Sequence, residues 1–383
     1  MFISPACRQV LRLSSVKGLG LKRFYELLGV AGSVEALFSG QFSSECQNKL
    51  SPALWRAVAP VLSENPSAYD KTYLDTIETW LAGDSSRHVI CIEDCRYPAL
   101  LNEVFCPPPV LYVQGEMSVL TKPSISIVGS RKPSLAGLRH AQLFAGELAA
   151  KGICVTSGLA LGIDGAAHRA AMQVGGVTCA VLGTGLDRIY PRQHESLAAE
   201  ISCQGVLVSE MKLGTPPLPH HFPRRNRIVS GLSNGVLVVE AGVKSGSLIS
   251  ARFALEQNRE VYAVPGSIDN LHAKGCHYLI KQGARLVESV DDVLGELRFD
   301  SEQTPFSGCL PSQANTSNVT LDDEERKLLE LMGSECVSFD FLAGLLANDA
   351  EYLIQRLLIL ELKGLIAQVP GGYQSLKPVN FGQ

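Results

Sequence analysis

The sequence predicts an α/β fold in which a parallel β-sheet is covered on both faces by helices. A helical module precedes this sheet domain and a winged-helix-like module follows it. From residue 124 onward, short continuous apolar runs alternate with longer amphipathic runs, a pattern typical of strands that are buried on both faces by helices. The apolar runs end in glycine-bearing loops, and in such sheets ligands bind at the carboxyl ends of the strands.

Composition is that of an ordinary globular protein. The 383 residues are 46% hydrophobic and 19% charged, with a net charge of −4. This length suits two or three domains, and a polyanion site in a mildly acidic chain must come from local clustering of cations. The first residues show no signal-peptide pattern, and no run approaches the roughly 18 apolar residues that a membrane helix needs. We therefore expect a cytoplasmic protein with no membrane partner.

The 11 cysteines are odd in number and scattered along the chain. Cys91 and Cys95 are the closest pair, but no second pair follows at zinc-site spacing. We therefore expect buried, reduced thiols and no metal.

Residues 1–84 predict the helical module. Apolar residues between Leu11 and Leu28 recur at roughly helical spacing, and Gly18-Leu19-Gly20 predicts a hairpin between two short helices. Such a hairpin can present backbone amides to a phosphate, as in helix-hairpin-helix modules. A purely structural turn explains a single Gly-Leu-Gly at least as well.

Residues 85–300 predict the sheet domain. Two short strands, in HVICIEDC and VLYVQG, flank a stretch stiffened by prolines at 107–109. From Ser124 strands alternate with helices, and the expected strands are SISIVGS, ICVTSGL, TCAVLGTG, VLVSEM, GVLVVEA and EVYAVPG, with ARLVES as a candidate last strand.

Two segments follow the sheet domain. Residues 301–320 are rich in Ser, Thr, Pro, Asn and Gln, which predicts a flexible linker. Residues 321–383 contain three candidate helices, a strand, a Pro-Gly-Gly turn and a second strand. Three helices and a hairpin predict a winged-helix-like unit.

The stretch from Glu210 to Glu240 is the strongest candidate for a functional site, because no other acidic residue lies between those two glutamates. Its cations and nearby aromatic ring are Lys212, Phe222, Arg224, Arg225 and Arg227. Positive charge around an aromatic ring suits a polyanion whose bases can stack, as single-stranded nucleic acid does. A solvated basic loop is the alternative.

Two loops could add phosphate contacts. Gly129-Ser130-Arg131 closes a strand: the glycine allows close backbone approach, the serine can donate, and the arginine supplies charge. Lys244-Ser245-Gly246-Ser247 lies at the start of a predicted helix, where small donors form a phosphate nest. The convergence of such loops along one rim favours binding over purely structural turns.

Other loops give weaker signals. Asp164 suits a helix N-cap, with His168 one turn later. The pair could perform acid–base chemistry, but no nucleophile lies nearby in the sequence, so capping and packing are favoured. Gly183-Thr184-Gly185 lacks the third glycine of a dinucleotide fingerprint, because Arg188 stands there, and no P-loop motif occurs. We therefore expect neither a nicotinamide cofactor nor ATP hydrolysis by a P-loop.

Over roughly residues 95–295 the chain resembles the DNA-processing protein A (DprA/Smf) family. The resemblance is carried, in order, by SISIVGSRKPS, SGLALGIDGAAHRAA, GTGLDRIYP, FPRRNRIVSGLS, VVEAGVKSGSLISARFALEQNREVYAVPG and GCHYLIKQGA. His194 departs from the family pattern, which has asparagine after the Tyr-Pro. The two terminal modules also lie where many family members carry such modules.

The resemblance implies an extended Rossmann-like domain, flanked by an N-terminal module of SAM or helix-hairpin-helix type, that binds single-stranded DNA rather than a cofactor. It implies no catalytic chemistry, but protection of incoming strands and help in loading the RecA recombinase during natural transformation. It also implies a homodimer, for which the amphipathic helix SLISARFALEQN and the strand after it are a candidate surface; ordinary core packing is the alternative role for the apolar residues of this helix. The expected DNA-binding residues, from the loops and by position in the family motifs, are Gly129, Ser130, Arg131, Phe222, Arg224, Arg225, Asn226, Arg227, Lys244, Ser245, Gly246 and Ser247.

Two alternative functions remain open. A nucleotide-processing Rossmann-like hydrolase would also use a glycine-rich loop, an arginine and a glutamate, here Glu240, although the chain lacks the P-G-G-x-G-T-x-x-E run of that group. An interaction scaffold would instead use the terminal modules to dock partners.

Overall fold

The computed structural model describes residues 3–40, 43–63, 71–295, 365–369 and 372–375, together with residues 328, 342, 353, 356, 357 and 360. The chain forms two compact units, residues 1–306 and 307–383. The predicted linker over 301–320 lies outside the described residues.

The first unit begins with helices, as expected. In the described part of residues 3–82 these are α1 (Pro5–Ser14), α2 (Leu21–Ala31), α3 (Val34–Phe38), α4 (Ser43–Lys49), α5 (Pro52–Leu62) and α6 (Lys71–Ala82). The predicted hairpin joins α1 to α2, with Gly18 at φ +91° in the left-handed region that glycine favours. Buried residues of these helices share one core with Val89, Val110 and Tyr112 of the first two strands.

A nine-stranded sheet follows, in the order β1-β2-β6-β5-β4-β3-β7-β8-β9. Its strands are β1 (Arg87–Cys91), β2 (Val110–Gly115), β3 (Ser124–Gly129), β4 (Cys154–Ser157), β5 (Thr178–Leu182), β6 (Val206–Ser209), β7 (Gly235–Glu240), β8 (Glu260–Ala263) and β9 (Arg285–Leu286). The seven strands from β6 to β9 in this order pair in parallel, which confirms the predicted parallel sheet. The first two predicted strands extend it as an antiparallel edge.

The chain reverses its direction of travel across the sheet between β3 and β7. After β3 the strands β4, β5 and β6 are added successively on one side, and β7, β8 and β9 on the other. At such a reversal the connections that follow the two neighbouring strands run in opposite directions. A crevice therefore forms between these connections, outside the carboxyl ends of the strands.

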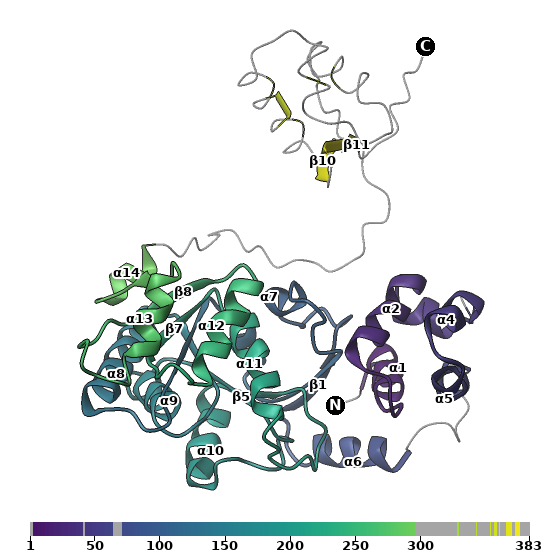
Figure 1. The fold of residues 1–383 in the computed structure, drawn as a ribbon. Coiled ribbons are helices and arrows are strands. Elements are labelled where there is room, and N and C mark those ends of the chain that lie inside the picture. Colours follow the sequence, from purple (N-terminus) through teal and green to yellow (C-terminus); the bar gives the residue numbers. More distant parts are fainter. Residues whose placement is uncertain are drawn as a thin grey trace. The chain divides into compact units, whose positions relative to one another are not determined.

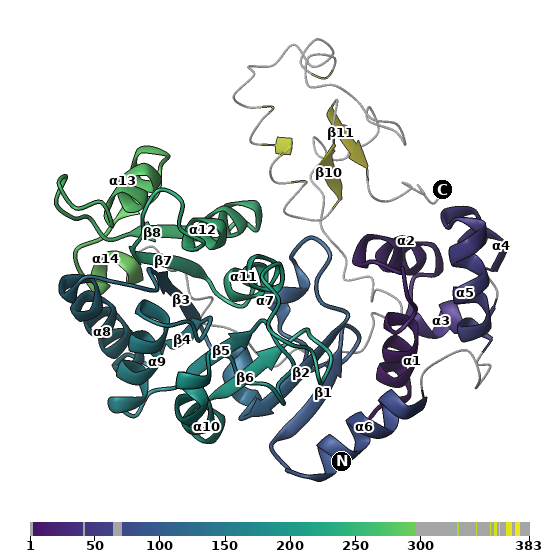
Figure 2. The same cartoon turned by 60° about the horizontal axis from the view of Figure 1, so that its bottom comes forward.

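Helices cover both faces of the sheet (Figures 1 and 2). Residues of α8, α9 and α14 pack with Ile125 and Ile127 on one face, and residues of α11, α12 and α13 pack with Val128 and Val236 on the other. The remaining helical elements of the domain are α7, η1, η2 and α10. Their bounds are α7 (Ala99–Asn102), η1 (Met117–Thr121), α8 (Leu135–Ala150), α9 (Ile163–Gln173), η2 (Arg192–His194), α10 (Glu195–Gln204), α11 (His221–Gly231), α12 (Ser247–Glu256), α13 (Lys274–Lys281) and α14 (Val290–Leu294).

The second unit is described in part. Strands β10 (Ile366–Val369) and β11 (Gly372–Ser375) pair antiparallel, as predicted for the C-terminal hairpin. Its described core consists of Leu328, Leu342, Leu353, Leu357, Leu360, Leu365 and Ile366. Most residues of the three predicted helices lie outside the described part of the chain.

The described residues contain no candidate for a membrane-spanning helix. None of their helices combines the length and the apolar character that crossing a bilayer requires.

Candidate nucleic-acid interface

A cavity of about 560 Å³ lies at the carboxyl ends of β3 and β7, where the chain reverses. Its wall is built from the loops after β3, β4, β5, β6 and β7 and from residues of α9, α11 and α12. Of the sequence-predicted residues it includes Gly129, Arg131, Phe222, Arg225, Asn226, Ser245, Gly246 and Ser247. The structure therefore brings together residues that are more than 100 positions apart in the sequence.

The loop after β3 is fixed in place by its neighbours. The amide of Ser130 donates to the carbonyl of Glu240 at 2.8 Å, which ties the end of β3 to the end of β7. A side chain at Gly129 would lie 2.6 Å from Ile163, so this position excludes any residue larger than glycine. Arg131 is exposed beyond this tie, and its guanidinium carbon lies 5.7 Å from the centre of the Phe222 ring.

Two aromatic rings face the cavity together. Phe222 stands in the first turn of α11, and the ring of Tyr190 lies 5.4 Å from it, tilted by 47°. Tyr190 is 44% exposed and lines the cavity. Sequence reasoning missed Tyr190 as a site residue, although the Tyr-Pro after a glycine-rich loop was a usable signal.

Arg225 forms part of the cavity floor but is almost wholly buried there. It is 4% exposed and donates through Nη1 to the carbonyl of Val181 at 3.0 Å. Burial lowers its pKa to about 10, an effect that the nearby Asp164 carboxylate partly offsets. A side chain on Gly158 would clash with this guanidinium, at 1.6 Å from Nη1, so the β4 loop needs glycine to cover it.

The predicted nest at 244–247 lies beside the cavity at the start of α12. Ser245 and Ser247 hydrogen-bond through their hydroxyls at 2.6 Å, and both line the cavity together with Gly246. Asn226 donates to the carbonyl of Gly246 at 3.2 Å and so links α11 to this loop. Ser130 and Lys244 stand in the expected loops but outside the cavity lining.

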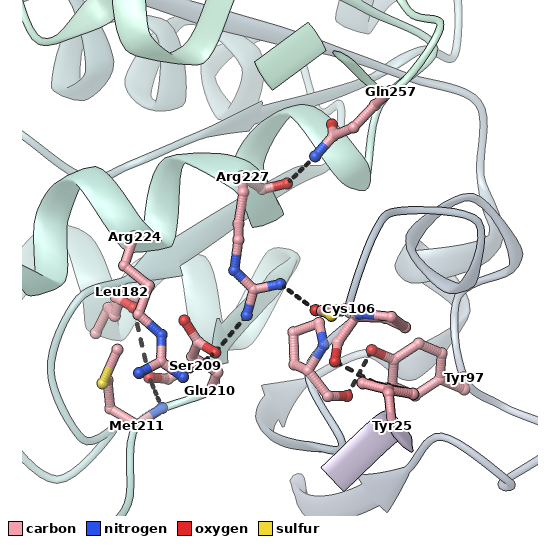
Figure 3. Close-up of polar contacts among 12 residues, drawn as sticks. Tyr25, Tyr97, Cys106, Leu182, Ser209, Glu210, Met211, Arg224, Arg227 and Gln257 are labelled. Carbon is pink, nitrogen blue, oxygen red and sulfur yellow. Dashed lines mark hydrogen bonds and ion pairs between the residues drawn. The ribbon is translucent and has the colours of Figure 1, made fainter. Parts of the chain in front are cut away.

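Arg224 and Arg227 do not face this cavity. Both donate to the same oxygen of Glu210, at 3.0 and 2.6 Å, on another side of α11 (Figure 3). The side chains of Arg227 and Glu210 are only 11% and 2% exposed, whereas that of Arg224 is 48% exposed. From the sequence, Glu210 was recognised only as the boundary of a basic stretch. Its pairing with Arg224 and Arg227 was not predictable, because these residues lie far from it along the chain.

Arg227 also belongs to a polar network around the proline-rich loop (Figure 3). It donates to the carbonyl of Cys106 at 2.8 Å. The hydroxyl of Tyr25, from α2, donates to the carbonyl of Pro107 at 2.9 Å, and that of Tyr97 to the carbonyl of Pro108 at 2.7 Å. Three consecutive carbonyls are thus satisfied by side chains from three parts of the chain.

The N-cap prediction for Asp164 is wrong. Gly162 is the N-cap of α9, and Asp164 accepts instead from the amides of Gly158 and Ala160 in the preceding loop, at 3.1 and 3.3 Å. Gly162 takes the cap because its φ is +81° and a side chain there would lie 2.4 Å from the Ser130 carbonyl. Burial raises the pKa of Asp164.

His168 has the packing role that was favoured. Its Nδ1 hydrogen-bonds with Thr178 Oγ1 at 2.7 Å, and the ring is fully buried. Burial lowers the pKa of His168 to about 3, so the imidazole is neutral at physiological pH.

Glu240, the acid of the alternative hydrolase, is occupied in holding the backbone. It is 4% exposed, and its oxygens accept from the amide of Ser134 at 3.0 and 3.2 Å and from the Ser134 hydroxyl. Ser134 in turn caps α8. In the described residues, no group of three or more His, Cys, Asp or Glu side chains is placed to hold a metal ion.

The matches to known proteins cover most of the chain. Residues 88–298 match the model of the DNA recombination-mediator protein A family, and residues 312–372 match the DprA winged helix domain. The chain is 44% identical to Protein Smf of Escherichia coli over 81% of its own length and 83% of the relative's. It is 41% identical to DNA processing protein DprA of Streptococcus pneumoniae over 61% and 83%.

The fold is similar to a solved relative. The crystal structure of DNA processing protein A from Streptococcus pneumoniae matches with a TM-score of 0.61 and 35% sequence identity, over 78% of this chain and the whole of that one. The Rossmann-like sheet domain and the C-terminal winged helix expected from sequence are thereby confirmed.

Proposed function

This chain belongs to the DNA recombination-mediator protein A family, and on that premise we propose that it binds single-stranded DNA in the cavity at the carboxyl ends of β3 and β7. The observation that carries the proposal is the meeting of an exposed arginine, two aromatic rings and a serine-rich helix start in one wall. Single strands are held in this way, by cations along the backbone and aromatic faces under the bases.

Each part of the wall has a separate role in this proposal. Arg131 and the start of α12 receive phosphates. Arg131 supplies positive charge, the hydroxyls of Ser245 and Ser247 line the cavity, and the positive end of the helix dipole favours an anion. Phe222 and Tyr190 offer ring faces to bases. Arg225, in the floor, contributes mainly positive potential, because its guanidinium is almost wholly buried and donates to the Val181 carbonyl.

The protein binds its strand without catalysing a reaction on it. Supporting this, Glu240 accepts from the amide and the hydroxyl of Ser134, and one oxygen of Asp164 accepts from the amides of Gly158 and Ala160. Release of free base from nucleoside monophosphates, lost in Glu240→Gln, would overturn this statement in favour of the hydrolase.

Two substitutions, at Arg131 and at Phe222, distinguish the contribution of charge from that of base stacking. We expect Arg131→Ala to weaken binding of oligo-dT and to flatten the salt dependence, since each phosphate contact on a single strand contributes roughly 0.7 to the log–log slope. With about four phosphates neutralised, the unsubstituted protein should show a slope near −3. Phe222→Ala should cost ~1–3 kcal/mol of binding free energy with little change in slope, because it removes stacking.

Fluorescence anisotropy across a salt series measures both quantities. Arg252→Ala is the control, since Arg252 is an exposed arginine on α12 that pairs with Glu256 away from the cavity. Unchanged affinity and slope in Arg131→Ala would remove the assignment of that residue.

We also propose a role in homologous recombination: the protein protects incoming strands in the cytoplasm and delivers them to the RecA recombinase during natural transformation. This rests on the family, whose description names a recombination mediator. A pull-down of RecA by the purified chain tests the contact directly.

We further propose that the chain forms a homodimer. Apolar side chains are exposed on α12 and on the loop between β8 and α13, namely Leu255 at 58%, Ile268 at 77% and Leu271 at 73%. Burial of such side chains in an interface is favourable. Sedimentation velocity at micromolar concentration should show a dimer, and Leu271→Asp should shift it toward monomer. A single monomeric species for the unsubstituted chain would contradict the proposal.

A further inference from the structure

A second cavity, of about 340 Å³, lies on another side of the first turn of α11. It is enclosed by the α1–α2 hairpin, by β2 and by the loop after β6. Its lining includes His221 and Arg224, while Phe222 and Asn226 of the same helix line the first cavity. The two cavities are therefore adjacent across one helical turn.

Three polar atoms in the residues that line this second cavity have no hydrogen-bond partner. They are Oγ of Ser14, Oε1 of Glu210 and Nδ1 of His221, all shielded from bulk water. Glu210 is informative because its side chain is 2% exposed and both arginines donate to its other oxygen, Oε2 (Figure 3). A buried carboxylate oxygen without a donor is costly, so a ligand that offers an N–H group would be favoured here.

The rest of the wall suits a flat, apolar ring. Phe24 and Tyr112 contribute aromatic surface, and Leu11, Leu19 and Met211 contribute aliphatic surface. Stacking on such surfaces stabilises any base.

The mouth of the cavity suits an anion. Gly20 is the N-cap of the 11-residue helix α2 and gives its first amides no side-chain acceptor, and the first turn contains no acidic residue. Gly20 and Leu21 line the cavity, and Lys22 is exposed in the same turn. Free amides and positive charge at a helix start favour a phosphate.

We propose that this second cavity receives one further nucleotide of the strand held in the first, with the base edge donating to Glu210 and a phosphate at the start of α2. The proposal rests on the proposed single-stranded DNA binding. It also gives the Gly-Leu-Gly hairpin a ligand, as part of a composite site with α11.

The carboxylate gives this subsite a base preference. Glutamate accepts well from the exocyclic amine of cytosine, and adenine and guanine also offer amines. Thymine offers one ring N–H between two carbonyl oxygens, which repel a carboxylate. Oligo-dC should therefore bind about fivefold or more tightly than oligo-dT, since one such contact discriminates by that order.

The test compares labelled 20-mers of dC and dT by anisotropy. Leu19→Trp fills the cavity from the hairpin side and should reduce the dC-to-dT affinity ratio to about one, while oligo-dT affinity is retained. Leu143→Trp is the matched control, because Leu143 is a half-exposed leucine on α8 that lines neither cavity. Glu210→Gln provides a second variant, with its melting temperature recorded to confirm that it is folded, and should lose the same preference.

The outcomes separate this proposal from the first. Equal affinity for dC and dT in the unsubstituted protein, or a ratio unchanged by Leu19→Trp, overturns the subsite and leaves strand binding intact. Loss of binding to both oligomers on Arg131→Ala concerns the first cavity alone. Millimolar dCMP that binds the unsubstituted protein but not Leu19→Trp, without any oligomer preference, would assign the cavity to a free nucleotide and overturn the strand version.

Discussion

Replacing Arg225 with methionine is expected to lower the free energy of unfolding of the first unit by about 3–5 kcal/mol, the range for breaking a buried charge pair from one side. The guanidinium is buried beneath the β4 loop, and Asp164 lies close enough for each to influence the pKa of the other. Without Arg225, the Asp164 carboxylate would remain buried without this cation, and its charge would be stabilised by hydrogen bonds from the Gly158 and Ala160 amides and the Ser157 side chain.

The loss should depend on pH in a defined direction. Burial already raises the pKa of Asp164 above its unfolded value, and removing Arg225 raises it further, since Arg225 lowers it. A raised carboxyl pKa makes stability fall as pH rises through it. The deficit of the variant should therefore be larger at pH 8 than at pH 5.

Urea unfolding followed by tryptophan fluorescence measures this, because the two tryptophans of the chain, Trp55 and Trp80, both lie in the first unit. Arg252→Met is the control: its ion pair with Glu256 is exposed, and such pairs contribute about 0–1 kcal/mol. A loss for Arg225→Met no larger than for the control would mean that Arg225 is not a structural charge.

Arg227→Met is expected to cost about 3 kcal/mol of stability while leaving oligo-dT affinity unchanged. Arg227 donates to a nearly inaccessible carboxylate and to the part-buried Cys106 carbonyl, so its loss leaves each of these acceptors short of a donor. Its side chain is absent from the lining of the first cavity, so a phosphate there would not lose a contact.

Arg224→Met is the matched comparison, because Arg224 donates to the same Glu210 oxygen from a side chain that is 48% exposed. We expect it to cost less than about 1 kcal/mol. If Arg227→Met instead kept its melting temperature and lost affinity for DNA, the contact role inferred from sequence would be right and the structural role wrong.

The different roles of Arg225 and Arg227 show which features of the site could be predicted from the sequence and which could not. The strands of the sheet were predictable because their apolar runs are continuous, and the loops at Gly129 and Ser245 were predictable because they end such runs. The four-residue run from 224 to 227 was predictable as basic, but which of its side chains faces which cavity depends on how α11 packs against the sheet. Arg225 and Arg227 are two residues apart in α11, so at 100° per residue their side chains leave the helix on nearly opposite sides.

Contacts between residues far apart along the chain could not be predicted from the sequence. Glu210 meets Arg227 only because β6 and α11 are brought together by the sheet, and Tyr190 meets Phe222 only because the β5 loop ends beside α11. Asp164 was misassigned because an aspartate at the start of a helix is commonly its N-cap. Here the N-cap is Gly162, because the close approach of the Ser130 carbonyl leaves no room for a side chain at that residue.

The three consecutive carbonyls at 106–108 have a consequence for dissecting the chain. One of their donors, Tyr25, belongs to the amino-terminal helices, and those helices also cover Val110 and Tyr112. A shortened protein starting near residue 85 would expose this apolar edge to water and leave the Pro107 oxygen without its tyrosine. Poor solubility of such a fragment would then reflect a severed core and would not show that the helices take part in binding.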